Sequence, residues 1–240
     1  MADTATAATP RSRRTQTERS EAMRARLVDA TLQCLVDVGY AGTTVSRIVE
    51  TARVSRGAPV HHFPSKAALI EAAAEQLVRR FYILFGKMIQ AVDTADDRVS
   101  NLVQTGWKLL LTAPEVTALL ELLVASRHEP ELAAMLQKLW VMAYQVARNA
   151  GEHYLEPVGS SDSVGDLIIL SQWLLRGMAE DLHISRATAV PMDYERFFAR
   201  YLQLWSRILA NHLRARPGVD TPPPKPAYWD VSFSGVPDAD

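Results

Sequence analysis

The chain has 240 residues, of which 48% are hydrophobic and 22% are charged, and its formal net charge is −1. This composition excludes a highly charged disordered chain and provides enough apolar side chains for a large core. No apolar run reaches the roughly 18 residues of a membrane span, and the N-terminus lacks the apolar core of a signal peptide. We therefore expect a cytoplasmic globular protein that has no membrane partner.

Positive charge is concentrated in the N-terminal third of the chain. Between Arg11 and Arg80 there are twelve Lys and Arg residues against seven Asp and Glu residues, so the remainder of the chain is acidic. Residues 1–20 are rich in Ala, Thr and Arg without apolar periodicity, which predicts a disordered arm. Such an arm either enters a DNA minor groove or is a tail that contacts nothing, and its arginines are Arg11, Arg13, Arg14 and Arg19.

The first predicted helix covers residues 26–40. Its apolar side chains recur at helical spacing, and Gly39 stands where a glycine with positive φ commonly ends a helix. The single cysteine, Cys34, lies on or beside this apolar side and has no partner for an internal disulfide. We expect Cys34 to be a buried core residue in a reducing compartment rather than a redox sensor, because sensing requires an exposed thiol.

Residues 44–63 predict two short helices separated by a turn of about three residues, which is the arrangement of a helix-turn-helix. Thr44 and Ser55 are expected to cap the two helices, and the break falls at Arg53 and Val54. The pair is too small to fold alone, so it needs the preceding helix, and the three helices form a compact head. The apolar positions of the pair are Val45, Ile48, Val49, Ala52, Val54, Val60 and Phe63.

Residues 24–74 resemble the N-terminal domain of TetR-family transcriptional regulators, because GY, TT, I, VS, G, HHF, SK and L occur in the family's order and spacing. Two departures are Arg53 in place of the usual turn glycine, and Pro59 and Val60 in place of the usual Leu-Tyr pair. Either the turn differs from the family's or Arg53 adopts a strained backbone. The resemblance implies an all-α protein: a three-helix helix-turn-helix head, residues 21–65, joined by a long helix to a larger helical ligand-binding and dimerisation bundle, residues 66–216.

The exposed side of the helix-turn-helix carries residues suited to a DNA duplex. In the major groove Arg56 can read a guanine and Ala58 a thymine methyl, while other polar side chains and helix N-termini bind phosphates. His61 and His62 are adjacent, so on a helix their side chains point about 100° apart, which argues against a shared metal ion. The resemblance implies that both contact DNA. The alternative is that one of the two caps the helix or packs in the core. The predicted DNA-binding residues are Thr44, Ser46, Arg47, Arg56, Gly57, Ala58, His61, His62 and Lys66.

Only helices are predicted after the head. Ser65 is expected to cap a long helix over residues 66–91, which joins the head to the body as a lever or as a plain spacer. Thr112 and Glu115 match a capping box around Pro114. The other helices are expected at residues 96–111, 112–127, 129–154, 163–184 and 193–214, with Ser163 as a cap of the fourth, and the body shows no strand pattern.

The last two predicted helices carry more apolar surface than a one-sided helix needs, which implies a partner. The resemblance implies that they form a four-helix homodimer interface, and two heads related by a two-fold axis read a palindromic double-stranded operator. The alternative is that both helices are internal core. The predicted interface residues are Leu170, Leu174, Gly177, Met178, Phe198, Leu202, Trp205 and Leu209, with Phe197, Tyr201 and Ile208 beside them.

Large side chains between the long helix and the last two helices are candidates for a small-molecule pocket, because ligand sites in bundles are mostly apolar with few polar anchors. Ordinary core packing is the alternative for each of them. The predicted pocket residues are Gln104, Trp107, Leu111, Leu119, Leu123, Met135, Trp140, Tyr144 and Trp173, and further polar anchors are expected among Glu121, Arg127, His128 and Gln172.

Together these features predict a sequence-specific DNA-binding regulator, a repressor that a small apolar or aromatic ligand releases from its operator. A ligand-independent regulator and a helical protein-interaction module are the alternatives. The sequence shows no nucleophile-base pair, phosphate loop or metal-ligand spacing, so we expect neither an enzyme nor a cofactor or metal. Residues 217–240 are rich in proline and are expected to be an extended tail, whose candidates for docking are Tyr228, Trp229 and Phe233.

Overall fold

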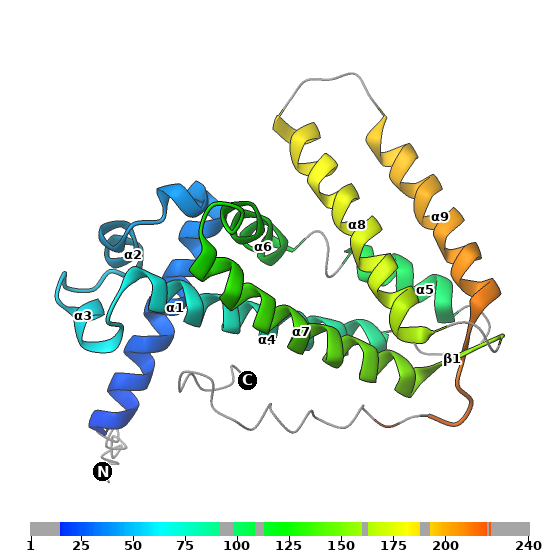
Figure 1. The fold of residues 1–240 in the computed structure, drawn as a ribbon, viewed down its shortest axis with the longest axis horizontal. Helices are drawn as coiled ribbons and strands as arrows, with labels where there is room; N and C mark the ends of the chain where they lie inside the picture. Colours follow the sequence, from blue (N-terminus) through cyan, green and yellow to red (C-terminus); the bar gives the residue numbers. More distant parts are fainter. Residues whose placement is uncertain are drawn as a thin grey trace, which may run out of the picture.

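The computed structural model of the chain describes residues 15–91, 98–108, 113–159, 163–187, 193–219 and 221. These residues form an almost entirely helical protein, as predicted (Figure 1). The predictions for Arg11, Arg13, Arg14, Leu111, Thr112, Tyr228, Trp229 and Phe233 lie outside the described residues. The elements are α1 (Gln16–Gly42), α2 (Val45–Ala52), α3 (Ala58–His62), α4 (Lys66–Ala91), α5 (Arg98–Gly106), α6 (Pro114–Ala125), α7 (Pro130–Tyr154), β1 (Leu155–Pro157), α8 (Val164–Ala187), α9 (Tyr194–His212) and β2 (Leu213–Ala215).

Helix α1 begins earlier than expected. Thr15 and Glu18 form a capping box in which the Thr15 hydroxyl accepts a hydrogen bond from the Glu18 backbone at 3.2 Å and the Glu18 carboxylate accepts from the Thr15 backbone at 2.7 Å. Residues 16–20, which were predicted to belong to the disordered arm, are therefore helical and include Arg19. The capping residues lie in a polar stretch that has no apolar periodicity, so a helix was not predicted there.

Gly39 interrupts α1 with a φ of 69°, in agreement with the predicted positive φ. The helix resumes and continues to Gly42 instead of ending there. The Gly39 carbonyl accepts hydrogen bonds from the Thr43 backbone at 3.1 Å and from the Thr43 hydroxyl at 2.7 Å. Thr43 is fully buried, so these bonds satisfy polar groups that would otherwise be costly to bury.

The caps of α2 and α3 differ from each other. Thr44 caps α2 as predicted, since its hydroxyl accepts a hydrogen bond from the Arg47 backbone at 3.2 Å. The predicted Ser55 cap of α3 is wrong: Gly57 precedes this helix and makes no side-chain cap bond, while the Ser55 backbone carbonyl accepts from Ala58 at 3.0 Å. Helix α3 starts later because Pro59, whose φ is fixed near the helical value, sits in its first turn.

Two hydrophobic cores divide the described residues. The first joins α1, α2 and Phe63 to the first half of α4, to α6 and to the start of α7. The second joins α5, α8, α9 and both short strands to the end of α7. The predicted boundary between residues 65 and 66 is therefore not a boundary between cores, because α6 and the start of α4 share the core of the head.

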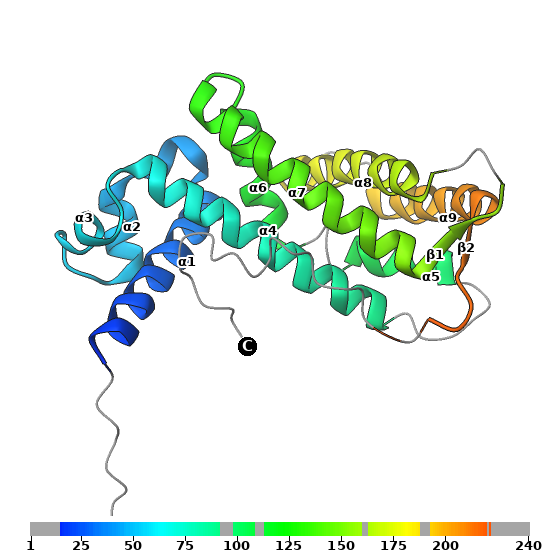
Figure 2. The same ribbon diagram turned by 60° about the horizontal axis from the view of Figure 1, so that its bottom comes forward.

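Helices α4 and α7 run along the molecule and belong to both ends of it (Figures 1 and 2). Ser65 caps α4 as predicted, accepting from the Ala68 backbone at 3.2 Å. Helix α6 begins at Pro114 after Ala113, which makes no side-chain cap bond, and the predicted capping box involves Thr112, which lies outside the described residues. Helix α5 covers Arg98–Gly106, residues 107 and 108 are π-helical, and the rest of the helix predicted to residue 111 is not described.

The short antiparallel pair of β1 and β2 was not predicted. Leu155 pairs with Ala215 and Pro157 with Leu213, and the Arg216 backbone donates to the Tyr154 carbonyl at 2.8 Å. Strands of three residues are too short to show an alternating pattern in the sequence. The pair fastens the chain after α9 to the end of α7. None of the described helices is both long and apolar enough to cross a membrane.

Candidate nucleic-acid interface and effector cavity

The outer surface of α2, the following turn and α3 is polar and exposed. Helix α2 buries Ile48, Val49 and Ala52, of which Ile48 and Ala52 belong to the first core, so its other side faces outward. Figure 1 places α2 and α3 at the end of the molecule that is remote from α8 and α9. Of the predicted DNA-binding residues, the exposed ones are Thr44, Ser46, Arg47, Arg56, Gly57 and His61, while Ala58, His62 and Lys66 are half-buried.

The turn between the two helices is left-handed at Arg53, with φ 52° and ψ 49°. Two interpretations were open for Arg53 in place of the usual turn glycine: a different turn, or a strained backbone at the arginine. This geometry corresponds to the strained backbone. The Arg53 backbone donates to the Glu50 carbonyl at 3.0 Å, and its own carbonyl accepts from Arg26 Nη2 at 3.4 Å. This surface exposes three arginines, Arg47, Arg53 and Arg56, and one carboxylate, Glu50, so it carries a net positive charge.

Lys66 is engaged inside the protein as well as near the predicted interface. Its Nζ donates to the Tyr40 carbonyl at 3.4 Å and lies 4.5 Å from the centroid of the Tyr40 ring. Burial, with a smaller effect from the negative charge of Glu129, raises the pKa of Tyr40 above its ordinary value. An ammonium group has three donors, so the contact leaves Lys66 further hydrogen-bonding capacity.

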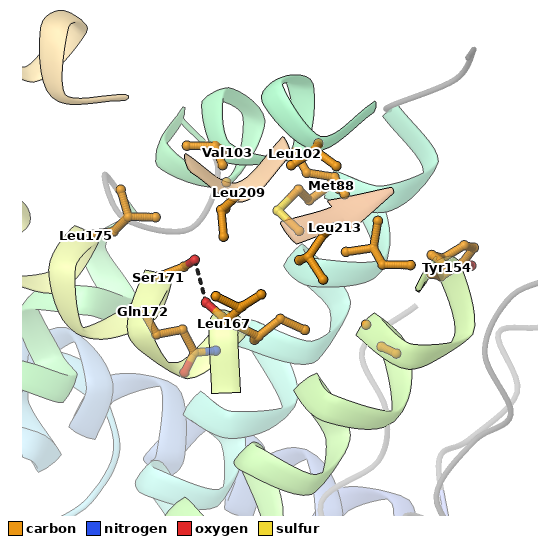
Figure 3. A pocket seen from close by; sticks show the side chains of 16 residues that line it. Met88, Leu102, Val103, Tyr154, Leu167, Ser171, Gln172, Leu175, Leu209 and Leu213 are labelled. Atoms are coloured by element: carbon orange, nitrogen blue, oxygen red, sulfur yellow. Dashed lines mark hydrogen bonds between the residues drawn. The ribbon is translucent and has the colours of Figure 1, made fainter. Parts of the chain in front are cut away.

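A cavity of about 130 Å³ lies in the second core (Figure 3). Its lining contains no charged side chain, and its polar side-chain atoms come from Ser171, Gln172 and Tyr154. Ser171 Oγ donates to the Leu167 carbonyl at 2.7 Å and accepts from Trp205 Nε1 at 2.9 Å. The other lining residues are Met88, Val99, Leu102, Val103, Gly106, Ala150, Gly151, Leu155, Leu167, Ile168, Leu175, Leu209 and Leu213.

Of the nine predicted pocket residues, Leu111 lies outside the described residues and the other eight are not in this lining. Of the other proposed anchors only Gln172 is in it. Leu119, Leu123 and Met135 pack against the first core instead. Gln104 and Trp173 are exposed, and Tyr144 is half-buried. Side-chain size indicated burial but did not indicate which of two cores a residue joins.

The remaining predicted pocket residues have other partners. Trp107 packs on the second core, with its ring centroid 5.3 Å from that of Phe198. Trp140 stacks under Arg176, whose guanidinium carbon lies 4.4 Å from the ring centroid. Burial lowers the pKa of Arg176, and the nearby Glu180 partly opposes that shift. Among the proposed anchors, Glu121 accepts a hydrogen bond from the Tyr40 backbone at 3.0 Å, and Arg127 and His128 are exposed.

An apolar face remains exposed on α8 and α9. It consists of Leu170, Trp173, Leu174, Phe197, Leu204 and Ile208, and Gly177 is exposed among them. We call these seven residues the outer apolar face. The predicted interface needs correction at Met178, Phe198, Leu202 and Leu209, which are at most 8% exposed because they form the second core of their own chain. Trp205 is half-buried.

Metal-binding side chains do not cluster in the parts of the chain that the structure describes: no three His, Cys, Asp or Glu residues there are placed to hold an ion. Cys34 is buried, as expected, with its Sγ 3.4 Å from Thr51 Oγ1. Apart from Gln172, the residues of the cavity lining were not predicted as a candidate site. They are mostly leucine, valine and glycine, which carry no signal that separates a ligand site from ordinary core.

The N-terminal part of the chain is similar to known bacterial regulators. Residues 27–73 match the family model described as "Bacterial regulatory proteins, tetR family". The HTH-type transcriptional regulator CymR of Pseudomonas putida is 31% identical over 126 residues, which cover 52% of this chain and 62% of CymR. The chain therefore matches about three fifths of that curated relative's length.

Solved structures share the fold. A transcriptional regulator from Pseudomonas aeruginosa PAO1 superposes with a TM-score of 0.56 at 24% identity, covering 82% of this chain and 92% of that one. The multidrug binding protein EbrR, complexed with imidazole, superposes with a TM-score of 0.51 at 19% identity, covering 86% of this chain and 98% of EbrR. At these identities the likeness extends to the helical architecture and not to ligands.

Proposed function

As the chain belongs to the TetR family of bacterial regulators through its helix-turn-helix head, we propose that it is a repressor that binds a palindromic operator as a homodimer and is released by a small apolar ligand. The observation that carries the DNA-binding part is the exposed, cationic surface of α2, the turn and α3, whose opposite side is buried in the first core. Such a surface supplies both the electrostatic attraction and the base-reading groups that a duplex requires.

In the proposed complex α3 lies in the major groove. Arg56 donates to a guanine edge and Ala58 contacts a thymine methyl, with Gly57, His61 and His62 facing the same groove. Phosphates are bound at the start of α2, where hydroxyl, cationic and backbone donors are exposed together. The proposed phosphate ligands are Thr44, Ser46 and Arg47 at this site, and Lys66 at the start of α4.

The outer apolar face supports the homodimer. Large apolar side chains such as Trp173, at 58% exposed, and Phe197, at 50%, are unfavourable in water and are typical of a protein interface when they cluster. A second copy of the chain carries the same face and can cover it around a two-fold axis. Two heads related by that axis require half-sites about 34–36 Å apart, or a multiple of that spacing.

The cavity supports control by a ligand. Its uncharged lining favours a small neutral apolar or aromatic molecule, since a charged group would lose hydration without gaining a partner. Met88 of α4 lines the cavity, while Leu69 and Leu77 of the same helix lie in the core of the head. A ligand that fits one position of α4 better than another can shift the head and release the operator, with a coupling of about 1–3 kcal/mol.

Selection of bound sites from random duplexes tests the DNA-binding part. The selected duplex should show inverted half-sites and salt-dependent affinity, and exchanging both Arg47 and Arg56 for Ala should weaken its binding about a hundredfold. Lys138→Ala, which removes an exposed positive charge from α7, is the matched control and should bind as the unchanged protein does. Failure to enrich any duplex, or equal binding by all three proteins, contradicts the proposal.

A further inference from the structure

Helix α3 is too short to hold its own position. It has five residues, the N-cap residue Gly57 before it makes no side-chain cap bond, and helices of this length are unstable in isolation. The angle at which α3 meets a duplex therefore depends on contacts from other parts of the head. Those contacts decide whether Arg56 and Ala58 reach the base edges together.

Arg24 of α1 makes such a contact at the far end of α3. Its Nη1 donates to the backbone carbonyl of His62 at 2.8 Å, and its guanidinium carbon lies 4.5 Å from the centroid of the Phe63 ring. Phe63 is 5% exposed and belongs to the first core. The same side chain thus holds the last residue of α3 and the residue that anchors the helix end in the core.

The chemistry of the Arg24 contact favours a fixed position for the end of α3. A positive donor is favoured at a helix C-terminus, where the last carbonyls lack backbone partners. The planar guanidinium can donate to a carbonyl and stack on a ring at the same time, which an ammonium group does less well. Arg26, two residues later on α1, donates to the Arg53 carbonyl at 3.4 Å, so α1 also contacts the turn before α3.

We propose that Arg24 is a positioning residue for DNA recognition: it sets the angle of α3 through His62 and Phe63 and does not itself bind the duplex. This inference rests on the proposed function, because it concerns how the head reads DNA. The competing role for an arginine in the head is a direct phosphate contact. The two roles predict different behaviour in the free protein and different dependence on salt.

Hydrogen exchange of the protein without DNA tests the contact of Arg24 with His62 and Phe63. The Phe63 amide donates to the Pro59 carbonyl at 2.7 Å, and the Ile48 amide in α2 donates to the Thr44 carbonyl at 2.9 Å. Arg24→Ala should speed exchange of the Phe63 amide about tenfold or more and leave the Ile48 amide unchanged. Arg19→Ala, which also removes an arginine from α1, should change neither amide. An unchanged Phe63 amide in Arg24→Ala overturns the inference.

Binding to the selected duplex separates positioning from phosphate contact. Arg24→Ala should lose about tenfold or more in affinity for the selected duplex, keep the slope of log affinity against log salt, and lose discrimination against random duplex. Arg24→Lys keeps the charge but should restore less than half of the lost discrimination, and it guards against a variant that fails to fold. A slope shallower by about 0.9 for each head, or about 1.8 for the dimer, with unchanged discrimination indicates a phosphate ligand and overturns the inference. If the unchanged protein binds no duplex, the proposed function fails. Hydrogen exchange of the Phe63 amide still decides whether Arg24 holds the end of α3.

Discussion

Gly39 is a position where the fold requires glycine for two reasons. Its φ of 69° with ψ of 179° lies in a region that residues with a side chain rarely adopt, and a Cβ there would lie 2.5 Å from Glu121 Oε2. The carboxylate of Glu121 is held in that place by the Tyr40 backbone donor. Any other residue at the joint between the end of α1 and α6 would therefore strain the backbone and displace the Glu121 carboxylate.

We expect Gly39→Ala to lower the free energy of unfolding by about 1–3 kcal/mol, from backbone strain and from displacement of Glu121. Denaturant unfolding followed by circular dichroism measures the change. Gly57→Ala is the control, because a Cβ at Gly57 meets nothing within 4 Å and its φ is −81°. Equal unfolding midpoints for the two variants would show that the joint at Gly39 tolerates a side chain.

Single residues were predicted best where the signal is local. Thr44, Ser65 and Ser163 cap their helices as expected, since a cap depends on a side chain and a backbone donor three residues away. Ser55 failed by the same criterion, because Pro59 and the left-handed Arg53 delay the start of α3. The Arg24 contact joins residues 38 positions apart, so no local pattern announces it.

At the scale of the element, we predict that two copies of the chain associate through the outer apolar face of α8 and α9. Replacing Trp173 and Ile208 by Glu puts charges into the proposed interface, and burying them unpaired should weaken the dimer about a hundredfold or more. Analytical ultracentrifugation over a range of protein concentrations measures the change.

Val141→Glu is the control for that experiment. Val141 is an apolar residue of α7, 51% exposed and outside the outer apolar face. The Val141→Glu protein should associate as the unchanged chain does. A stable dimer of the doubly substituted protein would show that the copies meet elsewhere, and a monomeric unchanged chain would remove the homodimer from the proposed function.

The orientation of α9 shows why interface residues were only partly predictable. One apolar stripe contains Phe198, Leu202 and Leu209, and another contains Phe197, Leu204 and Ile208. Both have helical spacing, so amphipathicity did not decide which one faces inward. Packing against α5 and α8 turns the first stripe into the second core and leaves the second stripe outside.

At the scale of the whole molecule, we predict that filling the cavity removes the effect of a ligand on DNA binding. Val103 of α5 lines the cavity, and Val103→Phe should fill much of its volume of about 130 Å³. The variant should still bind the selected duplex but should no longer respond to small aromatic compounds that weaken binding of the unchanged protein by about 5–150-fold. Titrating the operator duplex in the presence of uncharged monocyclic aromatic compounds measures the response.

Val124→Phe is the matched control for the filled cavity. It makes the same exchange at a valine of α6 that is 63% exposed, and it should keep the response. If Val103→Phe responds as strongly as Val124→Phe, the ligand binds outside the cavity. If no compound changes the affinity of the unchanged protein, a ligand-independent regulator is favoured.

The helical plan was predictable because α4 and α7 have long periodic patterns, and α4 was predicted with its observed ends, residues 66–91. The division into two cores was not, because it depends on which helices meet. Helix α6 lies with the head, so Leu119 and Leu123, which were predicted as pocket residues, pack against the first core and do not line the cavity. A sequence reports that such residues are buried but not which neighbours bury them.

The pairing of β1 with β2 makes the end of α9 part of the cavity wall. Leu155 in β1 and Leu213 in β2 both line the cavity, and the backbone of Val158 donates to the His212 carbonyl at 2.8 Å. A chain truncated after His212 would lose Leu213 and the pairing of β2 with β1. The hollow would then lack that part of its wall, and an apolar guest would have less surface to rest against, even though α7, α8 and α9 kept their full length.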